Sequence, residues 1–474
     1  MRVVVFGTGA YYRNRKDYFR NVEIVAFMDN NTEIQNTILD GAPVYAPKDA
    51  VLLEYDYICI MSDRNTASMI KQLIDLNADI DKIIIFETFV KKQKRIISEG
   101  CMQTYYKNVP GDVKGKKGKI LLMTHELSLS GAPIVLFYAA QILKKNGYDT
   151  AILSPKDGGL REVIMKSGIP VFVDAGITGD NEYLKNWMMG FNLVIVCTLT
   201  YGQFVGEMAD FPRPIIWWLH ESEEVYSGWW PRARPERIGS NVSIYAVGHR
   251  AIATYKKYFK NDNCKNLIYG IPNINDNWQK GYVKNHDNIV FAVIGVLQPR
   301  KGQDIFIEAI RRMRPEDKTN AEFWLIGPDP GIYPEFTEKL RQAAEKEPSI
   351  KIMGEMSMEM IKEQYPNIDV VVSPSRDDPM PVVMPEAMMF YKTCIVSDGA
   401  GTSALIEHKK NGLVCTCDAD SLAEQMTWVM HNQDKLMSIG VEGRKLYENV
   451  FSTEAFEKNL VEIVEGKLCS KTIM

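Results

Sequence analysis

Residues 373–390, SPSRDDPMPVVMPEAMMF, carry two carboxylates that could act together on one ligand. Asp378 lies in a Pro-broken loop after an apolar run, and Glu386 follows after seven intervening residues, near a helix expected to open at about Pro385. At such a turn the first carboxylate can reach the hydroxyls of a ligand, and the free backbone N–H groups of the turn suit a diphosphate. The alternative is a plain helix cap that complements the helix dipole.

Two cations, Arg300 and Lys301, lie in AVIGVLQPRKGQDIFIEA (292–309), between a predicted buried strand and a predicted helix. From that loop both side chains can point into a cleft. Two such cations suit a diphosphate, because fixed positive charges stabilise the negative charge that a departing diphosphate gains in the transition state more than they stabilise the ground state. A solvated basic pair in a loop is the alternative interpretation.

A strand, a small-residue turn and a helix are also predicted in THELSLSGAPIVLFYAA (124–140). Gly131 at this turn permits close approach of the backbone to a ligand. Because every α/β unit needs such a turn, Gly131 is a weak indication of a binding site when it is taken alone.

The segment PIIWWLHESEEVYSGWW (214–230) ends a predicted strand at His220, where the side chain would emerge at a cleft edge. The alternative is that His220 packs beneath the strand end. Trp229 and Trp230 are candidate acceptor contacts, because an indole ring can stack on a sugar, although aromatic pairs are more often part of a core.

These segments resemble the retaining glycosyltransferases of the GT-B fold, family 4, over roughly residues 118 to 460. The hallmark of that family is a carboxylate, seven residues, then Glu followed by Ala and Met. The resemblance implies that Asp378 contacts hydroxyls of the donor sugar and that Glu386 binds the nucleotide ribose. It assigns the pyrophosphate to Arg300 and Lys301, and it places His220 at the reaction centre as a hydrogen-bond donor.

In that family the departing phosphate oxygen can take the acceptor proton on the same face, so no strong base is required. The catalytic residues implied by the resemblance are His220, Lys301 and Asp378. The implied donor-binding residues are Gly131, Arg300, Lys301, Asp378, Val382, Val383 and Glu386. This chain has Asp378, Met380 and Pro381 where relatives commonly have Glu, Phe and Gly.

Metal binding is not expected, because no cluster of His, Cys or acidic residues has the spacing of metal ligands. We therefore predict a metal-independent reaction without a cofactor. The donor substrate would be a nucleotide-sugar such as a UDP- or GDP-sugar.

The first ninety residues resemble the small Rossmann-like domains attached to bacterial sugar-modifying enzymes. FGTGAYY supplies Gly7 and Gly9 of a dinucleotide fingerprint, with Tyr12 at the third glycine position, and Asp29 lies where a ribose-binding acid would sit. Gly7, Gly9 and Asp29 could form a second nucleotide site. The alternative roles are a scaffold, a surface for homo-oligomers or a docking domain for a partner.

Apolar runs alternate with helix-compatible stretches three times along the 474 residues, which is typical of parallel sheets covered by helices. We predict an α/β chain with a GT-B architecture of two facing Rossmann-like domains, preceded by an extra N-terminal Rossmann-like domain. The predicted parts are an N-terminal domain (1–100), a linker (101–117), an acceptor-side domain (118–280), a donor-binding domain (281–455) and a C-terminal helix packing back on the acceptor-side domain (456–474).

The bulk composition excludes some classes of protein. A formal net charge of −4 argues against a nucleic-acid binder, which needs a basic surface. Eight scattered cysteines indicate reduced thiols, and neither a signal peptide nor a long apolar run is recognisable, so we expect a cytoplasmic protein. A Lys-rich stretch at 107–119 makes peripheral contact with the inner face of a membrane one open alternative.

The function predicted from these residues is sugar transfer from a nucleotide-sugar to a glycan, lipid-linked or protein acceptor, in bacterial surface polysaccharide or glycoconjugate synthesis. Two alternatives stay open. One is a non-catalytic, glycosyltransferase-like binding subunit. The other is a non-hydrolysing nucleotide-sugar epimerase, which also has two facing Rossmann units but fits the separation of Asp378 from Glu386 less well.

Overall fold

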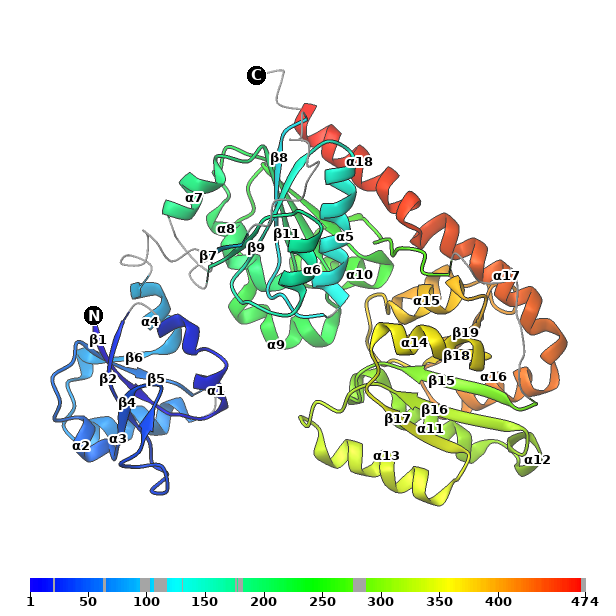
Figure 1. Cartoon of the computed structure of the whole chain (residues 1–474), viewed down its shortest axis with the longest axis horizontal. Coiled ribbons are helices and arrows are strands. Elements are labelled where there is room, and N and C mark those ends of the chain that lie inside the picture. The colour runs from blue at the N-terminus through cyan, green and yellow to red at the C-terminus, as the bar shows by residue number, and fades with distance from the viewer. Residues whose placement is uncertain are drawn as a thin grey trace.

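The computed structural model describes residues 1–19, 22–62, 65–93, 103–105, 117–129, 131–174, 177, 182–275 and 287–469. Three α/β units follow one another along the chain (Figure 1). Each has its own sheet, and in each sheet parallel pairing dominates. This confirms the predicted fold class.

The N-terminal domain has a sheet in the order β3-β4-β2-β1-β5-β6, parallel except for β3. Apolar side chains cover both faces of this sheet. Its strands are β1 (Arg2–Phe6), β2 (Glu23–Met28), β3 (Ile38–Leu39), β4 (Ala42–Tyr45), β5 (Tyr57–Ile60) and β6 (Ile83–Ile85). Its helices are α1 (Ala10–Arg13), α2 (Pro47–Ala50), α3 (Thr66–Asp75) and α4 (Phe86–Gln93).

The middle domain, which extends from β7 to Ile271, has a sheet in the order β14-β13-β12-β11-β8-β9-β10-β7. Its strands are β7 (Gln103–Tyr105), β8 (Lys119–Met123), β9 (Asp149–Ser154), β10 (Val171–Val173), β11 (Leu193–Cys197), β12 (Ile215–Leu219), β13 (Val242–Ala246) and β14 (Lys265–Asn266). Its helices are α5 (Gly131–Lys145), α6 (Leu160–Lys166), α7 (Glu182–Met188), α8 (Gly202–Glu207), α9 (Glu223–Ala233) and α10 (Gly248–Phe259). Strand β7 pairs antiparallel with β10 at the sheet edge, so part of the predicted linker at 101–117 belongs to this sheet.

The C-terminal domain has a wholly parallel sheet in the order β17-β16-β15-β18-β19-β20. Its strands are β15 (Ile289–Ile294), β16 (Ala321–Ile326), β17 (Ile350–Gly354), β18 (Val370–Ser373), β19 (Thr393–Ser397) and β20 (Leu413–Cys415). Its helices are α11 (Gln303–Arg312), α12 (Pro315–Lys318), α13 (Pro334–Lys346), α14 (Met358–Gln364), α15 (Val383–Met389), α16 (Ala419–His431) and α17 (Leu436–Leu446).

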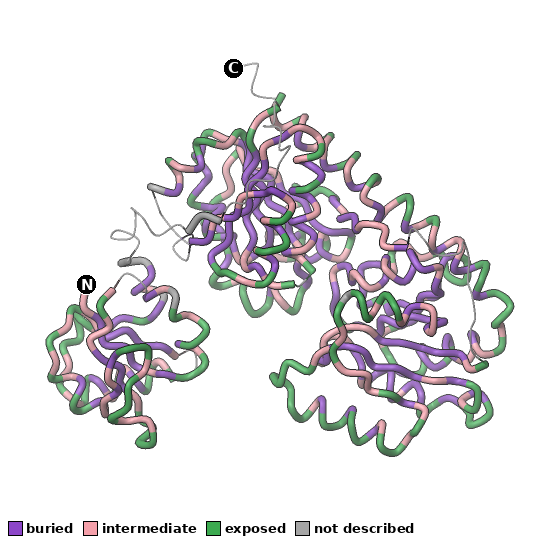
Figure 2. The backbone as a smooth tube through the Cα atoms, in the orientation of Figure 1, coloured by how far each residue is buried: buried purple, intermediate pink, exposed green. Residues whose placement is uncertain are grey.

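The strands of the two larger domains are buried along most of their length, and the outer sides of the helices are exposed (Figure 2). This burial explains why the central strands appear in the sequence as continuous apolar runs, since helices cover both faces of a parallel sheet. Strand β11, for example, reads LVIVC and is buried at every position.

The chain passes between the two larger domains at two neighbouring places. It leaves the middle domain after Ile271 and returns through a π-helical turn, η8 (Tyr447–Phe451), into the long helix α18 (Thr453–Cys469). The backbone N–H of Ile271 donates to the carbonyl oxygen of Phe451 at 2.8 Å. Helix α18 then lies along α5, and Phe456 stacks on Trp218 of the middle sheet.

The strand order of the C-terminal sheet changes direction between β15 and β18. The chain proceeds from β15 outward through β16 and β17, and from β18 outward on the other side. Open α/β sheets bind ligands at such a switch point, outside the carboxyl ends of the strands. The segments that follow β15 and β18 carry the predicted cations and the predicted carboxylates.

Candidate functional site

Arg300 and Lys301 end a short 3₁₀ turn, η4 (Pro299–Lys301), between β15 and α11. Gly302 follows with φ +73°, a backbone conformation that favours glycine. A Cβ at Gly302 would collide with the carbonyl oxygen of Pro374, so this turn lies directly against the segment that follows β18. The two loops are therefore packed together without room for a side chain.

Asp378 brings the two predicted motifs together. Its Oδ2 lies 2.5 Å from Nζ of Lys301 and 3.5 Å from NH1 of Arg300, and its Oδ1 accepts from the backbone N–H of Met380 at 3.3 Å. Burial acts to raise the pKa of the Asp378 carboxyl, but the charges of Lys301 and Arg300 outweigh it and hold the pKa below its ordinary value. Asp378 is thus an ionised carboxylate held by two cations.

Glu386 lies in a different environment, although only seven residues separate it from Asp378. Helix α15 begins at Val383, two residues before the predicted start, so Glu386 lies at the end of its first turn. Pro385 is accommodated there because the first turn of a helix needs no intrahelical N–H donors. Burial raises the pKa of Glu386 to about 7, against a hydrogen bond from the Tyr365 hydroxyl at 3.4 Å, which lowers it.

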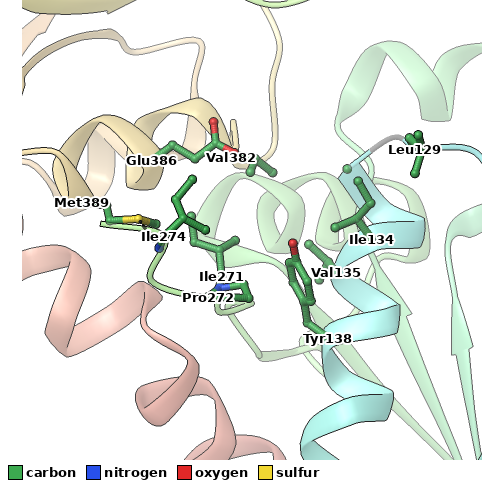
Figure 3. A pocket seen from close by; sticks show the side chains of 11 residues that line it. Leu129, Ile134, Val135, Tyr138, Ile271, Pro272, Ile274, Val382, Glu386 and Met389 are labelled. Atoms are coloured by element: carbon green, nitrogen blue, oxygen red, sulfur yellow. Dashed lines mark hydrogen bonds between the residues drawn. The ribbon is translucent and has the colours of Figure 1, made fainter. Parts of the chain in front are cut away.

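A cavity of about 200 Å³ lies between the middle and C-terminal domains (Figure 3). The C-terminal domain contributes α15, and the middle domain contributes the first turns of α5 and the crossing segment after β14. Glu386 is the one acidic side chain among the lining residues that the structure describes. The lining residues are Leu129, Gly131, Ile134, Val135, Tyr138, Ile271, Pro272, Ile274, Val382, Glu386 and Met389.

Gly131, predicted to allow close approach, starts α5 and faces α15 across this cavity. A Cβ at Gly131 would lie 3.7 Å from Cγ2 of Val382, an ordinary contact distance. Val382 caps the start of α15, and Val383 is its first helical residue. The structure therefore brings the predicted Gly131, Val382 and Glu386 to one cavity, whereas Val383, Arg300, Lys301, Asp378 and His220 are not among the residues that line it.

His220 directly follows β12, as predicted. Its Nε2 is buried and has no hydrogen-bond partner among the described residues. Burial, together with the nearby His125, lowers the pKa of His220 to about 3, so the imidazole is neutral at physiological pH. The ring also contacts the indole of Trp218, with 4.4 Å between centroids.

The two candidate acceptor aromatics behave differently. Trp229 is 45% exposed on α9, which leaves its ring available to a ligand. Trp230 instead packs in an aromatic cluster, stacked on Tyr226 at 5.9 Å and edge-on to Phe259 at 4.7 Å. Trp229 is thus the better candidate for an acceptor contact.

The predicted second nucleotide site in the N-terminal domain consists of Gly7, Gly9 and Asp29, which lie beyond the ends of β1 and β2. Gly7 has φ +103°, and a Cβ added at Gly9 would meet no atom within 4 Å. Asp29 does follow β2, but its Oδ2 accepts the backbone N–H and the hydroxyl of Thr8 at 2.9 Å and 2.8 Å. Tyr12, at the third glycine position, is buried in the domain core.

Several residues at the site were not found from the sequence. His125 follows β8, and its Nδ1 is buried without a hydrogen-bond partner among the described residues. Asp377 binds the middle domain through Arg250. The position of Asp377 beside Asp378 is a weak sequence signal, whereas Arg250 lies in a helix with no recognisable motif.

The described ranges contain no group of three His, Cys, Asp or Glu side chains that could hold a metal ion. In the same part of the chain, no helix is both long enough and apolar enough to span a bilayer.

Family models match the two larger domains separately. Residues 274–446 match a family described as glycosyl transferases group 1, and residues 114–238 match glycosyl-transferase family 4. Residues 1–84 match a family described as C2185-like, N-terminal. An uncharacterized glycosyltransferase of Methanocaldococcus jannaschii is 26% identical over 148 residues, which make up 31% of this chain and 37% of that protein.

Solved structures show the same fold. Anabaena HepE in complex with UDP superposes with a TM-score of 0.62 at 19% identity, over 73% of this chain and 100% of that one. Its complex with UDP-glucose gives 0.61 over 74% and 100%, also at 19% identity. Sucrose-phosphate synthase of Thermosynechococcus elongatus gives 0.59 at 16% identity, over 74% and 100%.

The two facing α/β domains, the cavity between them and the family matches on both domains define the class of this protein. The middle and C-terminal domains carry the glycosyltransferase family matches, and together they have the GT-B fold.

Proposed function

We propose that this protein is a retaining, metal-independent glycosyltransferase that moves a sugar from a nucleotide-sugar to a glycan, lipid-linked or protein acceptor. The observation that carries the proposal is the convergence of Lys301, Arg300 and Asp378 at the sheet switch point, close in sequence to Glu386 in the interdomain cavity. The UDP and UDP-glucose complexes of HepE support a nucleotide-sugar as donor.

Glu386 is proposed to bind the ribose of the donor. Its carboxylate lines the cavity, where two ribose hydroxyls could donate to it. Hydrogen bonds to the charged form favour ionisation, so bound ribose would lower the pKa of Glu386 from its unliganded value of about 7. Binding of the nucleotide would thereby supply further hydrogen-bond donors to this buried carboxylate.

Lys301 and Arg300 are proposed to stabilise the diphosphate as it leaves. Asp378 holds Nζ of Lys301 at 2.5 Å, so the ammonium group is already fixed before a ligand arrives. A fixed charge of this kind costs no reorganisation when negative charge develops on the leaving group. Asp378 can at the same time accept a hydroxyl of the donor sugar through its second oxygen.

His220 is proposed to orient the donor sugar at the reaction centre. A neutral imidazole whose pKa lies near 3 is a poor base at neutral pH, which fits a reaction in which the departing phosphate oxygen takes the acceptor proton. The buried Nε2 is free, among the described residues, to hydrogen-bond a ligand. Trp229 is proposed to contact the acceptor through its exposed ring.

The setting proposed for this reaction is the synthesis of surface polysaccharide or glycoconjugates on the cytoplasmic side of a bacterial membrane. This part of the proposal rests on the sequence resemblance.

A donor panel tests the proposed function. Purified protein is screened with UDP- and GDP-sugars by thermal shift, and the donors that stabilise it are then incubated with and without EDTA. We expect slow release of nucleoside diphosphate that EDTA does not change. Stabilisation without any turnover would favour a binding subunit, and activity lost with EDTA would refute metal independence.

A further inference from the structure

Asp377 directly precedes Asp378, yet its carboxylate is bound by the middle domain. Its Oδ2 accepts the hydroxyl of Ser222 and the backbone N–H of Glu224, each at 2.7 Å. Its Oδ1 accepts Nε of Arg250 at 2.9 Å, and NH2 of Arg250 lies 2.8 Å from the same oxygen. A side chain of the C-terminal domain thus has both oxygens occupied by groups of the other domain.

The groups that bind Asp377 suit a carboxylate. Ser222 and Glu224 lie at the start of α9, where backbone N–H groups lack partners within the helix and the helix dipole favours negative charge. Arg250, in the first turn of α10, makes a charge-assisted contact to one oxygen of Asp377 through two nitrogens, and it also donates to the carbonyl oxygens of Asp398 and Arg376, both at 3.2 Å. Arg250 therefore contacts the C-terminal domain at three places.

Three consecutive residues of this loop bind three different partners. Arg376 pairs with Asp304 of the same domain through two contacts of 2.7 Å. Asp377 binds the middle domain, and Asp378 binds Lys301. The loop after β18 therefore connects Lys301 with the middle domain through the contacts of two neighbouring side chains.

We propose that Asp377 is a positioning residue, which fixes the middle domain so that His220 faces the donor held by Asp378 and Lys301. His220 lies two residues before Ser222, and Asp377 is adjacent to Asp378, so this contact ties together the two segments that carry the reaction centre. The inference rests on the proposed function for its effect on turnover. Its structural part, a joint between domains, stands on the contacts alone.

Hydrogen exchange at the Glu224 amide measures this joint without any substrate. That amide donates to Asp377, so its exchange requires the domains to separate or α9 to open. The variants are Asp377→Ala and the isosteric Asp377→Asn. The control is Asp317→Asn, because Asp317 is equally buried and is paired with Arg314 at 3.0 Å, but within one domain.

In Asp377→Ala we expect exchange at Glu224 to accelerate at least about tenfold, while strands of the C-terminal sheet keep their protection. The turnover of donor should fall at least about tenfold, and the affinity for nucleoside diphosphate should change less than about threefold, because the ribose and phosphate contacts lie elsewhere. Asp377→Asn should likewise lower turnover more than nucleotide affinity, since a neutral amide cannot form an ion pair with Arg250. Asp317→Asn should alter neither exchange at Glu224 nor turnover.

If exchange at Glu224 is unchanged in Asp377→Ala, Asp377 does not hold the two domains together. Faster exchange with normal turnover would overturn the positioning role, and a parallel loss of nucleotide affinity would place the effect of Asp377 within the donor site instead. If the parent protein turned over no donor, the proposed function would fail, and the exchange measurement would still decide whether Asp377 joins the domains.

Discussion

Asp378 and Glu386 are both carboxylates at one loop and helix start, but their surroundings drive their pKa values in opposite directions. Two cations keep Asp378 ionised, whereas burial in the cavity wall raises the pKa of Glu386 to about 7. Opposite shifts of this kind separate the roles of neighbouring acids. Asp378 suits a fixed charge at the sugar and diphosphate, and Glu386 suits a carboxylate that becomes charged as a ligand supplies hydrogen bonds.

Replacing Lys301 with alanine should lower turnover by on the order of a hundredfold or more, because phosphate charge develops chiefly in the transition state. Nucleotide affinity should fall less. Steady-state kinetics and calorimetric titration separate the two effects. Lys318→Ala is the matched control, since Lys318 is similarly exposed and also paired with a carboxylate in the same domain, Glu347 at 3.1 Å. A loss confined to affinity would remove Lys301 from the catalytic group.

Replacing Glu386 with glutamine should weaken nucleotide binding by about 1.5 to 3 kcal/mol, because a charged acceptor for ribose hydroxyls is lost. The parent should also bind more tightly as pH rises from about 6 to 8, since ionisation of Glu386 increases through its pKa of about 7. Titration calorimetry of both proteins at each pH isolates this effect from the phosphate's own ionisation. Equal affinities in the two proteins throughout this range would contradict the ribose assignment.

The raised pKa of Glu386 also makes the stability of the unliganded fold depend on pH. Stability should fall as pH rises, whereas nucleotide affinity should increase. The folded state holds the Glu386 proton more tightly than the unfolded chain, whose pKa is near 4.5, so this group's contribution to stability declines as pH rises from about 4.5 to 7. The melting temperature of Glu386→Gln should therefore increase relative to that of the parent as pH rises over this range. A constant difference between the two melting curves would show that Glu386 is not desolvated.

The sequence predicted most of the site's residue types but not their contacts. The seven-residue separation identified Asp378 and Glu386, and the basic pair identified Arg300 and Lys301. The ion pair of Lys301 with Asp378 joins residues 77 positions apart, and such a distance cannot be read from spacing within one motif. The roles of these side chains toward a donor stay predictions.

At the scale of elements, two strand-turn-helix units support the site, β15-η4-α11 and β18 followed by α15. Their loops are packed face to face, and Gly302 is a point of close approach, with no room for a Cβ beside Pro374. The positions of Arg300 and Lys301 therefore depend on the close approach of Gly302 to Pro374 as well as on the contacts with Asp378.

Gly302→Ala should displace η4 and lower turnover together with nucleotide affinity, while the fold survives. Gly331→Ala is its control, because Gly331 has a similar φ of +67° but no atom within 4 Å of an added Cβ. Both variants carry left-handed strain of about 1 kcal/mol or more, and only the first adds a collision. Equal activity in the two variants would show that the packing of the loops does not hold the cations.

The buried strands can be recognised in the sequence, because a parallel strand covered on both faces is an uninterrupted apolar run. Strand β9, for example, reads DTAILS and is buried at every position after the first. Short edge or near-edge strands, such as β7, β10 and β14, cannot be recognised in this way. Two or three residues carry no periodicity, and their pairing partners lie far away in the sequence.

At the scale of the whole molecule, the two larger domains share an apolar core and the chain crosses between them twice, whereas the N-terminal domain has cores of its own. This division predicts that the N-terminal domain is separable from catalysis. It also predicts that the boundary lies before β7, which completes the middle sheet.

Deleting residues 1–100 should leave donor hydrolysis intact. Deleting residues 1–116 should lower thermal stability, because β10 loses its pairing with β7 and its backbone donors and acceptors become an open edge. Activity and melting temperature of the two truncations are compared with those of the full chain. A folded, inactive protein after the shorter deletion would make the N-terminal domain part of the catalytic unit, and a change in the oligomeric state would identify it as an interface.

Proton NMR of the reaction products distinguishes retention from inversion at the anomeric carbon of the donor sugar. The full-length protein is incubated with the donor that stabilises it best, and the anomeric signals are followed before mutarotation can mix them. We expect release of nucleoside diphosphate and a sugar product that first appears with the anomeric configuration of the donor, with both signals strongly reduced in Lys301→Ala. An inverted first product, or a nucleotide-sugar returned with altered sugar stereochemistry, would contradict a retaining transferase.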